Sequence, residues 1–201
     1  MSQVGKLSGF YDFLVLIVAR TSQELKYDEL AKAIGVSSPT IKNWVAILER
    51  SGVIVVLRPY ASTLTNRLVK TPKLYFMDTG LCAYLCRWPS PETMENGAMD
   101  GAFFETYVVS EIIKSYYNAG KTPDLYYYRD IDKKEIDLLI EKGDKLYPIE
   151  VKKAKNPAHA DKNFDVLKVF KKQVEPRLII CMSDELVPYS RNACYCPISL
   201  L

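Results

Sequence analysis

Histidine is almost absent from this sequence: His159 is the only one in 201 residues. A single histidine argues against acid–base chemistry or a nucleophilic triad built on imidazole. Zinc ligands are also scarce, because the cysteines are odd in number and lack paired CxxC spacing. We expect reduced, structural thiols at all five positions, which are Cys82, Cys86, Cys181, Cys194 and Cys196. Any catalysis must therefore rest on carboxylates and lysines.

Long apolar runs and nucleotide-binding loops are missing too. The longest strongly apolar stretch, residues 13–19, is well short of the roughly 20 residues that a bilayer requires. No basic start followed by an apolar segment resembles a signal peptide, so we expect a cytoplasmic protein without a membrane partner. The sequence "GKLS" at residues 5–8 lacks the glycine-rich loop and the strand of a P-loop, so we expect no ATP site on this chain.

What the chain does have is an ordinary globular composition. It is 48% hydrophobic and 25% charged, and its length allows two modest domains. The net charge of +3 is only a weak indication of a nucleic-acid partner. Local clusters of charge are therefore better evidence for such a partner than the net charge.

The first third of the sequence contains residues that start and end helices, followed by segments typical of strands. Residues 9–22 predict one helix, and residues 26–36 predict a second that stops at Gly35. A third is predicted from Ser38 as N-cap and Pro39 as first helical residue to Gly52. Strands are expected at 53–60 and 73–81. We interpret residues 1–96 as a winged helix-turn-helix domain that includes a linker, because prolines and glycines dominate residues 86–101.

The remainder, residues 97–201, predicts a second domain of α/β type. A helix over 102–120 ends at Gly120, and a strand over 124–132 follows. A hairpin over 135–153 leads to an amphipathic helix over 158–173 and a short buried strand over 177–183. This order predicts a mixed sheet flanked by helices, whose last strand returns over a helical crossover.

The hairpin places acids in an unusual position. If Gly143 and Asp144 form its two-residue turn, Asp137 lies opposite Glu150, and Lys152 lies on the same side. Directly opposed like charges destabilise a strand pair by up to about 1 kcal/mol, so this side requires either solvent or a cation. Mg²⁺ is often held by only one or two protein carboxylates. Lys152 could then orient a water or meet the charge that develops on a phosphate.

These residues resemble a known pattern. Asp137 followed by Glu150-Val151-Lys152 looks like the PD-(D/E)XK nuclease motif, although Ile136 replaces the proline. The resemblance implies a restriction-endonuclease-like fold in which Asp137, Glu150 and the Val151 carbonyl bind Mg²⁺ and Lys152 positions the attacking water. In that superfamily an acid on the preceding helix often completes the site, and Glu105 fits this role. The alternative for Glu105 is a structural ion pair with Arg129 or a lysine.

A second resemblance covers nearly the whole chain. The segments "LVKTPKLYFMDTGL", "GAFFETYVVSEI", "YYYRDIDKKEIDLLIE" and "LYPIEVKKAKNP" are similar, in this order, to the C-terminal region of a prokaryotic family of predicted AAA-type ATPases. That family carries a P-loop ATPase module ahead of this region. The resemblance implies that the chain is the part after the ATPase module, which would be its partner in the full-length protein.

Basic and polar residues of the winged helix indicate a DNA interface. Base and phosphate contacts are usually made from the start of the recognition helix and from the wing. The candidates are Thr40, Lys42 and Asn43 in the helix, Arg58, Arg67, Lys70 and Lys73 in or near the wing, and Lys153 and Lys155 after the hairpin. Similar charges also occur in winged helices that bind only protein.

Three functions follow from these observations. The first is a DNA-associated module with a Mg²⁺-dependent nuclease site. The second is an inactive nuclease-like fold that regulates an ATPase by binding DNA or protein. The third is a transcription-factor-like protein that uses only the winged helix. We favour the second slightly as the biological role of this chain and the first as the best chemical hypothesis, and the sequence indicates no oligomeric state.

Overall fold

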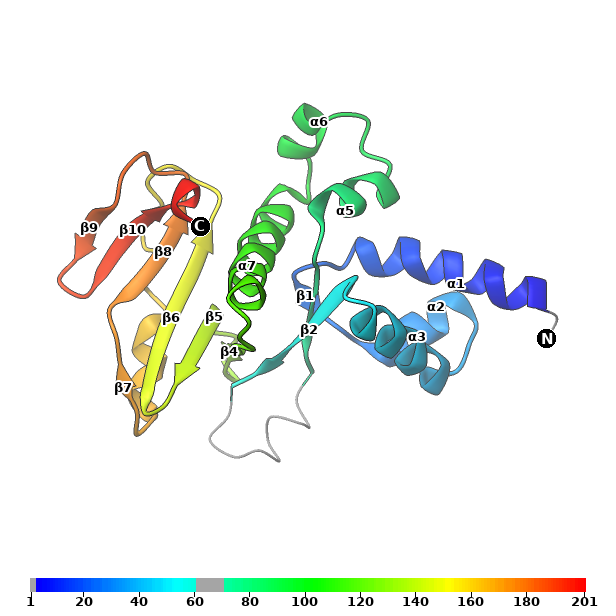
Figure 1. The fold of residues 1–201 in the computed structure, drawn as a ribbon, viewed down its shortest axis with the longest axis horizontal. Helices are drawn as coiled ribbons and strands as arrows, with labels where there is room; N and C mark the ends of the chain where they lie inside the picture. Colours follow the sequence, from blue (N-terminus) through cyan, green and yellow to red (C-terminus); the bar gives the residue numbers. More distant parts are fainter. Residues whose placement is uncertain (1–2, 61–70) are drawn as a thin grey trace. The chain divides into compact units, whose positions relative to one another are not determined.

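The computed structural model describes residues 3–60 and 71–201 and has a mixed α/β fold, as predicted (Figure 1). The chain divides into two compact units. Among the described residues, unit 1 holds 3–56 and 71–106, and unit 2 holds 57–60 and 107–201. Each unit is described by itself below. In the described part of the chain, no helix combines the length and the apolar character needed to span a bilayer.

Unit 1 begins with three helices, α1 (Gln3–Val18), α2 (Tyr27–Ile34) and α3 (Ser38–Arg50). The predicted glycine stop of α2 is confirmed, because Gly35 has a φ of 78° and its N–H bonds to the Ala31 carbonyl. The first helix ends earlier than the expected residue 22. After Val18 the backbone turns, and the Arg20 and Thr21 N–H groups bond to carbonyls three residues back.

The N-cap of α3 is Ser37, one residue before the predicted Ser38. Ser37 has an extended backbone, and its hydroxyl accepts a hydrogen bond of 3.3 Å from the Thr40 N–H. Ser38 is already helical, and its hydroxyl bonds to Asp28. Both serines are polar residues next to the helix start, so the sequence alone could not separate the two positions.

Three strands complete the first part of unit 1, namely β1 (Gln23–Glu24), β2 (Ile54–Pro59) and β3 (Lys73–Phe76). Their order in the sheet is β1-β3-β2, and β3 runs antiparallel to β1. The strand expected over 73–81 stops at Phe76. Asp78 accepts a hydrogen bond of 2.9 Å from the Leu81 N–H and so caps a helix, α5 (Thr79–Leu85).

Residues 86–101, expected as a linker, contain ordered structure. The helix α6 (Pro91–Glu95) is closed by a capping box, in which the Ser90 and Thr93 side chains each accept from the other's backbone N–H. Trp88, Met94 and Met99 pack against the core of unit 1. The prolines and glycines of this stretch therefore mark short turns around a helix.

Gly97 is needed where the backbone passes the indole of Trp88. A Cβ added at Gly97 would lie 2.8 Å from Trp88 Cζ3 and 3.0 Å from Cζ2. We expect Gly97→Ala to lower the free energy of unfolding by about 1–3 kcal/mol, because the ring must shift within a packed site. Urea unfolding measures this change. The control is Gly101→Ala, where a Cβ meets nothing within 4 Å and should cost nothing; equal effects of both substitutions would contradict this packing.

The helix α7 (Asp100–Asn118) begins in unit 1 and continues into unit 2. It is followed by β4 (Asp124–Arg129), β5 (Glu135–Lys142) and β6 (Lys145–Lys152). Further on lie the short β7 (Gln173–Val174), then β8 (Arg177–Cys181), β9 (Val187–Ser190), β10 (Ala193–Pro197) and the 3₁₀ turn η2 (Ile198–Leu200). Figure 1 shows β8 beside β6, with β10 and β9 beyond it.

The sheet of unit 2 has the order β2-β4-β5-β6-β8-β10-β9, with β2 contributing Arg58 and Pro59. β4, β5 and β6 are antiparallel neighbours, whereas β8 is parallel to β6, as the predicted crossover requires. The sequence analysis did not predict β9 and β10.

The prediction of an amphipathic helix over residues 158–173 is wrong. The segment contains only a 3₁₀ helix, η1 (Phe164–Val169), held by bonds such as Phe164 N–H to the Asp161 carbonyl. Phe164, Leu167 and Phe170 are spaced three apart, which suits the three residues per turn of a 3₁₀ helix. Phe164 and Leu167 are buried against Ile136, Leu139 and other core residues of the sheet.

Candidate functional site: a carboxylate–lysine cluster

The hairpin of β5 and β6 has the predicted register. Leu138 pairs with Ile149, and Ile140 pairs with Tyr147, as expected for a turn at Gly143 and Asp144. Because the strands are antiparallel, the start of β5 meets the end of β6. Asp137, Glu150 and Lys152 lie at these two ends and are therefore brought together by the backbone.

A β-bulge lies at Asp137. Tyr126 of β4 pairs with Leu139, but Tyr128 pairs with Ile136, so Asp137 and Leu138 together face one residue of β4. Bulges often re-aim side chains next to functional sites. Here Asp137 turns toward β6, and its Oδ2 accepts a hydrogen bond of 2.8 Å from the Val151 N–H. The sequence analysis missed this bulge, because four consecutive buried residues, 136–139, give no alternation from which to place it.

Lys152 joins the two acids. Its Nζ lies 2.7 Å from Glu150 Oε1 and 3.6 Å from Asp137 Oδ2. Asp137 and Glu150 are only 7% and 5% exposed, whereas the Lys152 side chain is 40% exposed. We name Asp137, Glu150 and Lys152 the carboxylate–lysine cluster. It consists of two buried acids with one ammonium group that solvent can reach.

The prediction of a cation in this cluster rests on its formal charge. Two ionised carboxylates and one ammonium group leave a net charge of −1, and buried charges are costly unless they are compensated. The predicted ligands of a hard cation are the carboxylates of Asp137 and Glu150 and the Val151 carbonyl. In the described residues, no group of three or more histidine, cysteine, aspartate or glutamate side chains is arranged for a metal ion. A cation here would therefore depend on two carboxylates and on water.

Glu105, predicted to complete this site, belongs to unit 1. Its Oε1 accepts hydrogen bonds from Tyr75 Oη at 2.6 Å and Lys73 Nζ at 3.1 Å, and its Oε2 accepts one from Ser22 Oγ at 2.7 Å. Lys73 and Tyr75 are 4% and 0% exposed. The described contacts of Glu105 therefore form a buried polar cluster within unit 1, and a catalytic role of Glu105 stays a prediction.

The same contacts correct the interpretation of Lys73 as a DNA-contacting residue. A lysine that is 4% exposed and paired with Glu105 cannot reach a phosphate backbone. The sequence analysis assigned Lys73 to the wing because it begins a strand after a basic connection. All four residues of β3 are buried, however, so Lys73 points into the unit.

The other predicted DNA contacts have varied environments. Lys42 and Asn43 are exposed on α3, whereas the Thr40 hydroxyl bonds to Ser37. Arg58 is exposed in β2. Lys155 is exposed and forms an ion pair of 2.5 Å with Asp184, and Lys153 is half-buried. Arg67 and Lys70 lie outside the described residues.

The fold and the cluster define a mixed α/β protein with a carboxylate–lysine site at the open end of a β-hairpin. Residues 100–201, half of the chain, match the family described as "Domain of unknown function (DUF4143)", and the chain belongs to this family. Residues 1–92 match a second family, "Domain of unknown function (DUF8612)".

The chain is also similar to longer mycobacterial proteins. It is 28% identical over 131 residues to "Uncharacterized protein Rv2008c" of Mycobacterium tuberculosis and to "Uncharacterized protein Mb2031c" of Mycobacterium bovis. The matched region is 65% of this chain and 29% of each relative, so the chain spans less than a third of their length. No solved structure matches the chain.

Proposed function

We propose that unit 2 is a PD-(D/E)XK nuclease-like domain that hydrolyses phosphodiester bonds of DNA with Mg²⁺. The observation that carries this proposal is the carboxylate–lysine cluster, in which a half-exposed ammonium group contacts two buried carboxylates. The Asp and Glu-x-Lys residue types, their order and their adjacency all agree with that motif. The bulge at Asp137 adds local support, because it aims the first acid at the strand that carries the others.

The residues fit a Mg²⁺ ion. Within the described residues, the hydrogen bond and ion pair of Asp137 both involve Oδ2, so Oδ1 is the oxygen that we expect a cation to take. Glu150 and the Val151 carbonyl would supply the other protein oxygens. When bound, Mg²⁺ would polarise the phosphate and lower the pKa of a water. Lys152 would hold that water and stabilise charge on the phosphate oxygens through its ammonium group.

Unit 1 supports the DNA-associated part of the proposal as a winged helix. Its elements follow the order α1, β1, α2, α3, β2, β3, and its strands are ordered β1-β3-β2. In a winged helix the helix that corresponds to α3 reads the DNA. Lys42 and Asn43 are exposed on this helix and suit contacts with phosphates and base edges.

The chain would serve as the C-terminal module of a predicted AAA-type ATPase in the cytoplasm. Two observations support this assignment. The sequence segments around β3, α7, β5 and β6 are similar to that region of the ATPase family, and the relatives are more than three times as long as the matched region. The ATPase module would then provide the energy-dependent step, while the present chain contacts the nucleic acid.

A second function is favoured by the ion pairs themselves. Lys152 already forms ion pairs with both acids, and Glu105 is held by residues of unit 1. A nuclease-like fold with this arrangement would be stable without a metal. The alternative is therefore an inactive module that binds DNA or protein and regulates the ATPase.

A cleavage assay separates the two functions. The purified chain is incubated with Mg²⁺ or Mn²⁺ and with duplex, branched and single-stranded DNA. The nuclease proposal predicts products that require the divalent ion and disappear with EDTA. Binding of these DNAs without cleavage of any of them, under every metal condition, would instead support the inactive module.

A further inference from the structure

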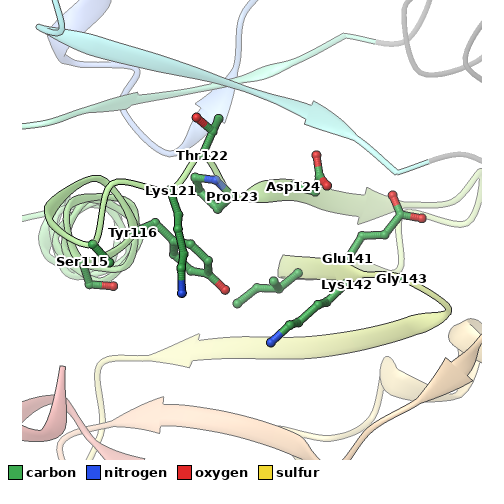
Figure 2. A pocket seen from close by; sticks show the side chains of 11 residues that line it. Ser115, Tyr116, Lys121, Thr122, Pro123, Asp124, Glu141, Lys142 and Gly143 are labelled. Carbon is green, nitrogen blue, oxygen red and sulfur yellow. The ribbon is translucent and has the colours of Figure 1, made fainter.

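A pocket lies in unit 2, at the end of β5 opposite the carboxylate–lysine cluster. The pocket has a volume of about 670 Å³ and is formed by the end of α7, the loop after it, and the last residues of β5 (Figure 2). Asp137 is near the start of β5, and Glu141 is four residues further along. At 3.3–3.4 Å per residue, about 13 Å of strand separates the pocket from the carboxylate–lysine cluster.

The charged side chains of the pocket are divided between two sides. Figure 2 shows the amino groups of Lys121 and Lys142 extending toward the same side, with the phenol of Tyr116 between them. The carboxylates of Asp124 and Glu141 lie on the opposite side in this view. The pocket therefore presents a cationic side and an acidic side.

Glu141 on the acidic side has partners outside the pocket, whereas the two lysines of the cationic side form no ion pair among the described residues. Glu141 Oε1 lies 2.8 Å from Lys172 Nζ and accepts a hydrogen bond of 3.2 Å from Tyr60 Oη. The hydrogen bond to Glu141 raises the pKa of Lys172, so this lysine stays charged. Among the described residues, Lys121 and Lys142 form neither an ion pair nor a hydrogen bond through their side chains. Asp124 and Glu141 also line the pocket but lie on its other side, so the two lysines favour an anion on the cationic side.

Part of the pocket lining is suited to a flat apolar group. This part includes the Tyr116 ring, Ile140, Pro123 and Ala119. Tyrosine offers both an aromatic face for stacking and a hydroxyl that donates a hydrogen bond. The volume also lies within the 300–1,000 Å³ that is usual for small-molecule sites. A bare inorganic anion would leave most of this space and its apolar lining unused.

The C-terminal end of α7 repels an anion less than a helix end with unbonded carbonyls would. A helix C-terminus carries partial negative charge on its last carbonyls. Here Gly120, with a φ of 67°, closes the helix, and the Lys121 N–H bonds to the Tyr116 carbonyl at 2.9 Å. The Gly120 N–H bonds in turn to the Tyr117 carbonyl. These carbonyls are therefore occupied, and the two ammonium groups dominate this side of the pocket.

We propose that this pocket binds a nucleoside phosphate, with the base against Tyr116 and the phosphate between the ammonium groups of Lys121 and Lys142. The phosphate can come from a free nucleotide or from the 5′ end of a nucleic-acid strand. The proposal does not depend on the nuclease function, because it uses neither Asp137 nor Glu150.

Calorimetric titration of the full chain in EDTA tests this site without any cleavage. The probes are AMP, adenosine, and one short oligonucleotide with and without a 5′ phosphate. We expect the phosphorylated probes to bind, and the double variant Lys121→Met/Lys142→Met to bind them at least about tenfold more weakly, because two charge-assisted contacts are lost. The matched control is Lys162→Met/Lys171→Met, which removes two exposed lysines outside the pocket and should leave binding unchanged.

The outcomes are distinct. Binding of AMP identifies a free nucleotide as a sufficient ligand, whereas binding of only the 5′-phosphorylated oligonucleotide identifies a strand end. Equal affinity for adenosine and AMP would overturn the proposal, because the lysines would then contribute nothing. It would also be overturned if no probe bound at millimolar concentration, or if both double variants weakened binding equally.

Discussion

Replacing Asp137 with asparagine is expected to reduce Mg²⁺-dependent DNA cleavage at least about a hundredfold. A metal ion contributes several kcal/mol to transition-state stabilisation, and each 1.36 kcal/mol corresponds to a tenfold change in rate. Asparagine keeps the shape of Asp137 and can still accept the Val151 N–H through its amide oxygen. The substitution therefore removes the negative charge while it preserves the hairpin. The measurement is the single-turnover cleavage rate with saturating Mg²⁺.

A nearby acid provides the matched control. Asp132 is exposed in the turn between β4 and β5, and Asp132→Asn makes the same chemical change outside the cluster. This variant should cleave DNA at the wild-type rate. If Asp137→Asn and Asp132→Asn both cleaved as fast as wild type, the cluster would not be the site of hydrolysis.

Replacing Lys73 with methionine is expected to have the largest effect on stability. The Lys73 and Glu105 side chains are 5% and 15% exposed, and their charged atoms lie 3.1 Å apart. Removing one partner of a buried ion pair costs about 3–5 kcal/mol, because the other charge stays buried without its oppositely charged partner. Lys73→Met should lower the free energy of unfolding of unit 1 by this amount, as measured by urea unfolding.

Two further variants test whether a loss of stability in Lys73→Met comes from the buried ion pair. Lys32→Met removes an exposed lysine from α2 and should change stability by less than about 0.5 kcal/mol. Adding Glu105→Gln to Lys73→Met should restore part of the loss, since the charge left without its oppositely charged partner is then gone. If Lys73→Met were as mild as Lys32→Met, the buried pair would not stabilise the unit.

The same cluster gives a way to test the predicted catalytic role of Glu105. A catalytic Glu105 would lose cleavage in the single variant Glu105→Gln without a change in stability. The contacts with Ser22, Lys73 and Tyr75 instead predict a loss of stability. Measuring both quantities on one variant distinguishes a reacting group from a structural one.

The parts of the fold that the sequence predicted correctly depend on local rules. The register of β5 and β6 follows from a two-residue turn at Gly143 and from the period of two along each strand. Gly35 and Gly120 end their helices because both adopt a positive φ, which glycine tolerates best. Asp137, Glu150 and Lys152 were brought together by this reasoning alone.

The parts that were missed depend on contacts between distant residues. The bulge at Asp137 is set by the pairing with β4, which the hairpin sequence does not encode. Residues 164–170 have apolar spacing that a helix of either 3.0 or 3.6 residues per turn could bury in part, and packing on the sheet selects the 3₁₀ form. The burial of Lys73 depends on Glu105, 32 positions later in the chain.

The central claim is that the carboxylate–lysine cluster holds a divalent cation, and calorimetric titration with Mn²⁺ tests it most directly. Mn²⁺ takes the same oxygen ligands as Mg²⁺ and usually binds more tightly. The account predicts one site per chain for wild type and for Asp132→Asn, and none for Asp137→Asn or Glu150→Gln. Equal binding by all four proteins, or no binding by wild type, would contradict it.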